Sequence, residues 1–352
     1  MNTPANTAIF GRDTTVNQLM RPIAPHLARE NVFEVTVNRP GELWARTFQG
    51  WERFDMPELT FTYLNSLANA ICVFNGIPLT SIVSVVMPGG ERGQIVMPPA
   101  CIDGTISLII RKHSLVVKTL DELAAENAFD IAKDVSFNQM SADEAKAQLV
   151  RRDFGRLEQF EVDLLALKRE GQWLKFLELC VSSRRNLIIS GKTGSGKTTF
   201  ARSLIERVPP DERLLTIEDV HELFLENHPN RVHMLYGYGK GRVSAVEALR
   251  SAMRQSPDRI FLAELRGDEA WEYVGSANTG HPGSITTTHA NNALQTFQRA
   301  GTLIKQSEVG RVLDMDMINR TLYSTIDVVL YFSERKLCEV FYDPMFAKEQ
   351  MR

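Results

Sequence analysis

The chain has 352 residues, of which 43% are hydrophobic and 24% are charged, and these shares are typical of a folded globular protein. They exclude disorder, collagen-like repeats and a coiled coil as descriptions of the whole chain, and the length suits two or three domains. The 40 basic and 43 acidic side chains give a formal net charge of −3. A chain with such balanced charge gives no strong indication of DNA binding, although it can still carry a local basic patch.

Compartment signals favour the cytoplasm. No apolar run approaches the roughly 18–20 residues needed to span a bilayer. The segment Met1–Phe10 has no basic stretch followed by an apolar one, so we do not expect a secretory signal. The four cysteines are Cys72, Cys101, Cys180 and Cys338. They form no CxxC pair, which argues against a zinc ribbon and predicts isolated, mostly buried thiols in a reducing compartment.

Residues 1–140 are predicted to form a mixed α and β domain. Two strand–turn–strand units are expected at Phe33–Phe48 and Ser81–Met97, because each joins apolar or β-branched runs through a turn with Pro and Gly. A further strand is expected at Thr105–Lys112. Between the hairpins, the apolar residues of Leu59–Phe74 recur every three or four positions, which predicts an amphipathic helix.

Residues 141–171 are charged, contain no proline and include few β-branched residues, so we expect a helical linker there. Residues 172–352 are predicted to form an α/β domain in which strands alternate with helices. The expected strands are Asn186–Ser190, Leu214–Ile217, Ile260–Ala263 and Ser284–Thr288, with a closing hairpin over Asp327–Tyr342. Ser244 and Glu247 form a capping box at one helix start. This alternation predicts a largely parallel sheet covered by helices.

The strongest functional signal is a phosphate loop that fits the pattern GxxxxGK[ST]. An apolar strand precedes it and a helix is expected to follow, so backbone N–H groups and the helix dipole can face one anion. A chance glycine-rich turn is the alternative, which this context disfavours. We expect Lys197 to bind the phosphates of ATP and the Thr198 hydroxyl to ligate Mg²⁺. The residues expected at the nucleotide are Gly191, Lys192, Thr193, Gly194, Ser195, Gly196, Lys197, Thr198 and Thr199.

Carboxylates follow two of the predicted strands. Glu218 and Asp219 come directly after one strand, with Glu222 three residues beyond, and Glu264 follows another. Ligands collect at the carboxyl ends of strands in an open α/β sheet, so these acids are expected to face the phosphates. We predict that Glu264 binds Mg²⁺ through water or polarises the attacking water, and that Glu218 or Glu222 takes part in catalysis. A solvated strand end or a helix cap is the alternative for each acid.

His289 ends the hydroxyl-rich strand Thr286-Thr287-Thr288. From that position the imidazole can hydrogen-bond a catalytic acid or sense the γ-phosphate, although an isolated histidine is more often structural. We do not expect it to bind a metal, since no second His or Cys lies at ligand spacing.

Together these segments resemble the type IV secretion traffic ATPases, the eleventh component of VirB-type systems. The resemblance covers nearly the whole chain. It rests on the phosphate loop at 191–198, the acidic box at 216–222, the second-carboxylate strand and its extension at 260–270, and the histidine box at 280–289. The sequence Glu264-Leu265-Arg266-Gly267 is specific for secretion ATPases among phosphate-loop proteins. In the first domain, the segments 90–95 and 110–114 look like the family's N-terminal strands.

The resemblance implies an α/β fold class, with a RecA-like phosphate-loop ATPase domain preceded by a PAS-like α+β domain. It implies that Arg92 and Arg111 reach the nucleotide from the first domain, and it favours a functional His289. It also implies a homo-hexamer that is cytoplasmic, peripheral to the inner membrane and associated with other type IV secretion components. In this interpretation ATP hydrolysis powers the transport of protein or DNA and pilus assembly.

Three alternatives remain at this stage. The nearest is a pilus or type II secretion motor of the same superfamily, but the scattered cysteines differ from the tetracysteine zinc module of the type II branch. A DNA-translocating ATPase would need a basic stripe with aromatic stacking partners. The segment 231–254 holds several arginines, but the net charge of the chain is −3, which does not favour this alternative. A nucleotide-switched scaffold without useful hydrolysis is disfavoured by the carboxylates.

Overall fold

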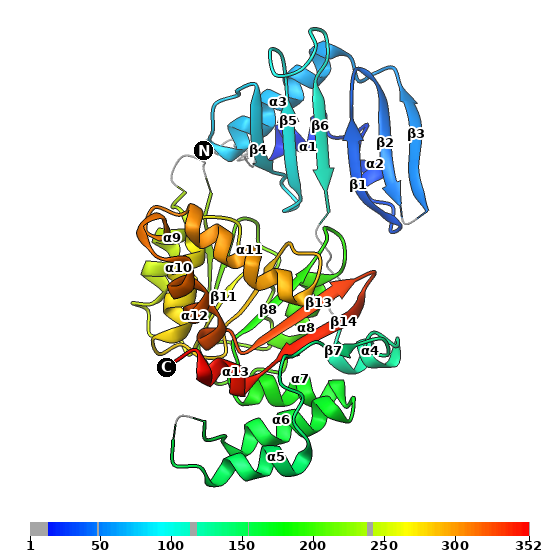
Figure 1. Cartoon of the computed structure of the whole chain (residues 1–352). Coiled ribbons are helices and arrows are strands. Elements are labelled where there is room, and N and C mark those ends of the chain that lie inside the picture. Colours follow the sequence, from blue (N-terminus) through cyan, green and yellow to red (C-terminus); the bar gives the residue numbers. More distant parts are fainter. Residues whose placement is uncertain (1–12, 48, 113–117, 154, 238–241, 352) are drawn as a thin grey trace, which may run out of the picture. The chain divides into compact units, whose positions relative to one another are not determined.

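The computed structural model describes residues 13–351 apart from residues 48, 113–117, 154 and 238–241 (Figure 1). The chain separates into two compact units, the first ending before residue 116 and the second holding most of the chain from Lys118 onward. Each unit has its own sheet and its own apolar core.

The first unit is built on a six-stranded antiparallel sheet with the order β3-β2-β1-β6-β5-β4. Its strands are β1 (Val32–Val37), β2 (Gly41–Thr47), β3 (Gly50–Met56), β4 (Ile82–Val86), β5 (Arg92–Val96) and β6 (Ser107–Arg111). Its helices are α1 (Thr14–Leu19), α2 (Ala24–Leu27) and α3 (Phe61–Asn75). Buried residues of α1, α3 and the sheet share one core, for which Val16, Leu64 and Val35 are examples.

Both expected hairpins and the expected helix of this unit are confirmed. The β1–β2 turn places Gly41 at φ +85°, and the β4–β5 turn places Gly90 at φ +89°, a region that glycine enters without cost. Helix α3 begins at Thr60, whose hydroxyl accepts from the Tyr63 N–H, and ends at Gly76 in a left-handed conformation. Strand β3 was not expected, because it is a mostly exposed edge strand in which three of the seven residues, Glu52, Arg53 and Asp55, are charged.

The second unit is built on an eight-stranded sheet with the order β10-β9-β11-β12-β8-β13-β14-β7. Its strands are β7 (Lys133–Asp134), β8 (Leu187–Gly191), β9 (Leu214–Glu218), β10 (Arg231–Leu235), β11 (Arg259–Leu262), β12 (Ile285–Thr288), β13 (Val328–Ser333) and β14 (Lys336–Tyr342). Neighbouring strands from β10 to β13 are parallel, whereas β14 runs antiparallel to β13. The sheet is therefore mixed, with a parallel centre and the expected closing hairpin.

Helices cover both faces of this sheet (Figure 1). They are α4 (Leu120–Ala125), α5 (Ala142–Ala147), the 3₁₀ turn η1 (Gln148–Val150), α6 (Gln159–Arg169), α7 (Trp173–Ser182), α8 (Lys197–Ile205), α9 (Ala245–Ala252), α10 (Glu269–Asn278), α11 (Ala293–Gln306), the 3₁₀ turn η2 (Gly310–Val312), α12 (Met315–Thr325) and α13 (Pro344–Glu349). Alternate residues of β8 enter different cores: Leu187 and Ile189 pack on one side and Ile188 on the other. Burial on both faces explains the unbroken apolar runs of the central strands. The predicted capping box is confirmed, since Ser244 and Glu247 satisfy each other's backbone N–H groups at the start of α9.

The division between the units differs from the one expected at 141–171. The helices of that segment belong to the second unit, and Leu164 and Leu165 on α6 are buried in the same core as Phe176 on α7. Helix α4 also contributes to this core, through Leu120 and Leu123. The charged face that suggested a linker is the solvent face of amphipathic helices, and the chain crosses between the units before Lys118.

The sequence also raised expectations for the cysteines and for membrane-spanning segments. All four cysteines are free thiols, with Cys72 and Cys180 buried and Cys101 and Cys338 half-buried. Among the described helices, none has both the length and the apolar character required to cross a membrane.

A buried ion pair ties β11 to the segment that precedes β9. Arg259 is 1% exposed, and its Nε and Nη2 donate to the two carboxylate oxygens of Glu212 at 2.7 and 3.0 Å. Its Nη1 donates to the carbonyl oxygen of Val181 at 2.8 Å. Burial alone raises the pKa of Glu212, but the hydrogen bonds and charge of Arg259 outweigh it and lower that pKa. The pair is therefore a bidentate clamp at the amino-terminal end of the sheet.

We predict that Glu212→Gln lowers the free energy of unfolding by about 3 kcal/mol, because it leaves the buried Arg259 charge without its counterion. Urea unfolding of the full chain, followed by circular dichroism, measures the change. Glu272→Gln is the matched control, since it removes the partner of the exposed Arg250 and is expected to cost less than about 1 kcal/mol. Equal, small effects of the two variants would contradict this role of the clamp.

Candidate active site

The phosphate loop lies at the carboxyl end of β8, in the centre of the second sheet. Gly191 ends the strand at φ +151°, and a Cβ at this position would lie 2.1 Å from the carbonyl oxygen of Phe332 on β13. Gly194 and Gly196 also have positive φ, of +78° and +100°. These positions therefore require glycine, two for the turn itself and one for the close approach of the neighbouring strand.

Lys197 and Ser195 place polar atoms inside the loop. The Nζ atom of Lys197 donates to the carbonyl oxygens of Gly191 and Lys192 at 2.8 and 3.0 Å. The Ser195 hydroxyl is buried and has no hydrogen-bond partner among the described residues. Helix α8 begins at Lys197, so its amino-terminal N–H groups face the same loop. A buried hydroxyl without a partner, a lysine and a helix amino terminus fit a polyphosphate with its metal ion.

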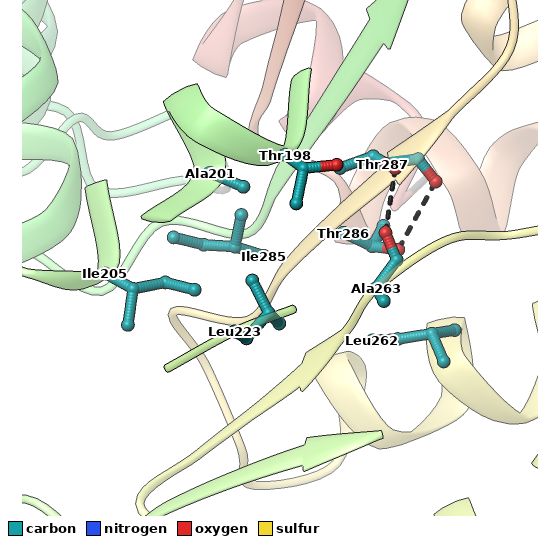
Figure 2. Close-up of a pocket in the computed structure, with 9 residues that line it drawn as sticks. All are labelled: Thr198, Ala201, Ile205, Leu223, Leu262, Ala263, Ile285, Thr286 and Thr287. Carbon is teal, nitrogen blue, oxygen red and sulfur yellow. Dashed lines mark hydrogen bonds between the residues drawn. The ribbon is translucent and has the colours of Figure 1, made fainter. Parts of the chain in front are cut away.

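A small cavity of about 10 Å³ lies beneath the loop, between α8 and strands β11 and β12 (Figure 2). Aliphatic side chains form most of its wall, together with Thr198 and Thr287. The Thr287 hydroxyl donates to the carbonyl oxygen of Ala263 at 2.7 Å, drawn as a dashed line in Figure 2. A space of this size holds about one water molecule and excludes a nucleotide, so it belongs to the packing that supports Thr198.

Glu264 follows β11, two strands from the phosphate loop, and both of its carboxylate oxygens are engaged. Oε2 accepts from Nη2 of Arg266 at 2.7 Å, and Oε1 lies 2.8 Å from Nε2 of His289. His289 follows β12, the strand between β11 and β8. The structure therefore brings two predicted site residues, Glu264 and His289, into direct contact at one edge of the sheet.

Arg266 joins this pair to the acidic box. Its Nη1 donates to Oδ2 of Asp219 at 2.5 Å while its Nη2 holds Glu264, so a continuous chain of polar contacts runs Asp219–Arg266–Glu264–His289. Burial favours the neutral carboxyl of Glu264, but the hydrogen bonds from His289 and Arg266 outweigh it and lower the pKa of Glu264 to about 2. Glu264 is therefore ionised at any pH at which the protein works.

Glu218 occupies a different place from Glu264. Its side chain is fully buried, and its Oε2 accepts from the backbone N–H groups of Glu222 and Leu223 at 2.7 Å each. Burial raises the pKa of Glu218, but hydrogen bonds from His221, His233 and these two N–H groups lower it to about 2. The structure thus makes Glu218 the anchor of the loop that carries Asp219 and Glu222, rather than a group in contact with Glu264.

Arg92 and Arg111 belong to the first unit. Arg92 opens β5 and Arg111 ends β6, and the two residues face each other in the antiparallel register. Glu34 on β1 faces Arg111 from the other side in the register, so a carboxylate lies next to this pair of like charges and offsets their repulsion. This cross-strand pair could not be read from the sequence, since its register depends on the tertiary fold. The neighbouring residues 113 and 114 lie outside the described part of the chain.

Comparison with known proteins agrees with these features. Residues 135–346 match the family described as Type II/IV secretion system protein. The chain is 39% identical to the type IV secretion system protein VirB11 of Brucella suis, over 96% of this chain and 92% of that protein.

Solved structures give the same result. The crystal structure of the VirB11 ATPase from the Brucella suis type IV secretion system, in complex with sulphate, matches with a TM-score of 0.53 and 38% identity, over 97% of this chain and 98% of that one. The pilus retraction motor PilT with bound ADP matches with a TM-score of 0.55 at 19% identity, over 89% of this chain and 77% of that one, which shows a shared fold. The chain therefore belongs to the VirB11 ATPases of type IV secretion systems, within the type II/IV secretion system protein family.

Proposed function

We propose that this chain hydrolyses ATP and that the energy released drives transport of protein or DNA, and pilus assembly, by a type IV secretion machine. The observation that carries the proposal is the position of the phosphate loop and the ionised Glu264 at the carboxyl ends of strands in one sheet. Sulphate in the related VirB11 structure and ADP in the PilT structure support an anion and nucleotide site on this fold.

Each part of the site has a role in this reaction. When bound, Mg²⁺ offsets the negative charge of the phosphates and of the leaving group. The Thr198 hydroxyl would hold this ion, and Glu264 would hold it through water or orient the attacking water. Lys197 exchanges its loop carbonyl partners for the phosphates, and Ser195 donates from beneath them. His289 fixes the Glu264 carboxylate, and Glu218 holds the loop on which Asp219 and Glu222 lie.

Arginines supply further positive charge at the γ-phosphate. Arg266 lies in the catalytic unit, where Asp219 and Glu264 occupy it. Arg92 and Arg111 form a paired guanidinium site on the first unit, and we assign to it the neutralisation of γ-phosphate charge, in the same copy or in a neighbour. Arginines that neutralise the γ-phosphate in this way are called arginine fingers, and they raise the rate by about 10³–10⁵ in phosphate-loop enzymes.

The assembly that suits this chemistry is a homo-hexamer. In this proposal the two compact units are the two domains, a PAS-like first domain and a RecA-like second domain. The six-stranded antiparallel sheet with α3 packed on it supports the first assignment, and the parallel central strands support the second. The hexamer is placed in the cytoplasm at the inner membrane, in peripheral contact with other type IV secretion components.

Lys197→Ala is predicted to lower kcat for ATP hydrolysis by at least about 100-fold, because a positive charge that offsets developing phosphate charge is removed. Phosphate release measures the rate, with circular dichroism to verify the fold. Lys175→Ala is the control, since Lys175 is an exposed lysine on α7 that hydrogen-bonds Gln172. A Lys197→Ala rate above about a tenth of the wild-type rate would contradict the assignment.

Glu264→Gln is predicted to separate ATP binding from hydrolysis. The amide keeps the shape and an oxygen that can accept from Arg266 or His289, but it loses the charge that orients water or metal. Equilibrium binding of ATP with Mg²⁺ should change little while turnover falls by about 100-fold or more. Glu170→Gln, at an exposed helix end, is the control. Parallel loss of binding and turnover would make Glu264 a structural residue instead.

The double variant Arg92→Ala, Arg111→Ala is predicted to retain its oligomeric state and to lose most turnover, by about 10³-fold if both act as fingers. Light scattering and phosphate release test the two parts of this prediction. Arg21→Ala changes an exposed arginine of the same unit and should leave turnover near the wild-type rate. Wild-type turnover in the double variant would contradict the role of these arginines, and the first unit would then be only a docking module.

A fragment that tests the second unit alone should begin near Lys118. A start near residue 154, inside the linker expected at 141–171, is the alternative, and that residue lies outside the described part of the chain. That choice would remove α4, whose Leu120 and Leu123 are buried in the core of the second unit.

A further inference from the structure

One side-chain cluster of the second unit contains two imidazoles, those of His221 and His233, that the proposed hydrolysis does not use. Glu218 at the end of β9, His221 in the loop that follows and His233 on the edge strand β10 converge on one point. Their potential ligand atoms all lie within 4.8 Å of one another. The two imidazole rings are 4.3 Å apart, measured between centroids. The cluster therefore joins three chain segments around a single buried carboxylate.

The Glu218 carboxylate is held in one orientation. Two backbone N–H groups occupy Oε2, at 2.7 Å each, which leaves Oε1 turned toward the histidines. The Thr216 hydroxyl donates to Oε1 at 2.7 Å and lies 2.8 Å from Nδ1 of His233. The contact with Oε1 resembles the outer hydrogen bonds that fix carboxylate ligands of metal sites, whereas Nδ1 of His233 would exchange its contact with Thr216 for the ion.

Two of the distances between ligand atoms are close to those around a tetrahedral ion. Oε1 of Glu218 lies 3.2 Å from Nδ1 of His221 and 3.7 Å from Nδ1 of His233. Metal–ligand bonds of about 2.0–2.2 Å place neighbouring ligands of a tetrahedral zinc ion roughly 3.3–3.5 Å apart. The side chains of His221 and His233 are 34% and 23% exposed, so a fourth position is open to water.

Charge favours an ion as well. Glu218 has no exposed surface, and both histidines that pair with it carry a full positive charge only when protonated. A bound divalent cation would instead give this buried carboxylate a permanent counter-charge, with both imidazoles neutral and acting as ligands. Two imidazole nitrogens and one oxygen suit Zn²⁺ or a similar first-row ion, whereas Mg²⁺ and Ca²⁺ prefer oxygen ligands.

We propose that Glu218, His221 and His233 form a divalent transition-metal site, with Zn²⁺ as the best-fitting ion and water as the fourth ligand. This site is distinct from the Mg²⁺ site at the phosphate loop, because its ligands are Glu218, His221 and His233 and not Thr198 and Glu264. The ion would bind the loop that carries Asp219 to the edge of the sheet, and so fix the far end of the Asp219–Arg266–Glu264 chain.

The test uses the full chain without a histidine tag, stripped of metal by a chelator and free of nucleotide. Titration with Co²⁺ alone should give one equivalent bound, with the strong visible absorption of a four-coordinate ion. Titration calorimetry with Zn²⁺ should give the same stoichiometry. His221→Gln and His233→Gln should each weaken Zn²⁺ binding by at least about 100-fold, more than the 10- to 100-fold typical of changes to outer-shell partners. His26→Gln, a histidine of the first unit that packs on Phe54, should bind as the wild type does.

The wild-type chain decides the question even if a variant does not fold. A weak, six-coordinate cobalt spectrum, a sulfur-to-cobalt band from the cysteines, or no stoichiometric binding would overturn the proposal. Unchanged Zn²⁺ affinity in folded His221→Gln and His233→Gln would also overturn it. None of these readouts depends on ATP turnover, so failure here leaves the proposed ATPase function unaffected, and the converse holds too.

Discussion

The second unit depends on one constraint: its central strands are buried on both faces, so the charged groups of the site gather at the ends of those strands. Leu187, Ile188 and Ile189 of β8 divide between two apolar cores and leave no room for chemistry along the strand. The chain therefore turns polar where the strands end, at Gly191, Glu264 and His289. The order β11-β12-β8 places these three ends side by side. The site follows from strand order in the sheet more than from nearness in sequence.

Much of this could be predicted from the sequence, and the reason is the strength of the local signals. The glycine spacing of the phosphate loop, the alternation of apolar strands with helices, and the turns of the two hairpins all depend on short-range chemistry. The β10 strand could not be predicted in the same way. It is an edge strand with Arg231 and His233 in it, and only pairing with β9 gives it a strand conformation. Strand β3 was missed for the same physical reason.

Contacts between residues far apart in the chain could not be predicted from the sequence. The ion pair of Arg266 with Asp219 joins residues 47 positions apart in the chain. The direct opposition of Arg92 and Arg111 is set by a strand register that no local pattern fixes. The anchoring of Glu218 away from Glu264 is equally a tertiary fact, because both acids end buried strands and look alike in sequence. In each case packing and register decide which side chains meet.

A structure of the full chain with Mg²⁺ and a non-hydrolysable ATP analogue would show directly whether the phosphate loop and Glu264 act on the nucleotide. We expect the β- and γ-phosphates to lie within the loop from Gly191 to Thr198. We also expect Nζ of Lys197 to leave the carbonyl oxygens of Gly191 and Lys192 and contact these phosphates, with Glu264 facing the γ-phosphate directly or through one water. A nucleotide bound elsewhere, or phosphates in the loop with Lys197 still on its carbonyl partners and Glu264 out of reach, would contradict this expectation.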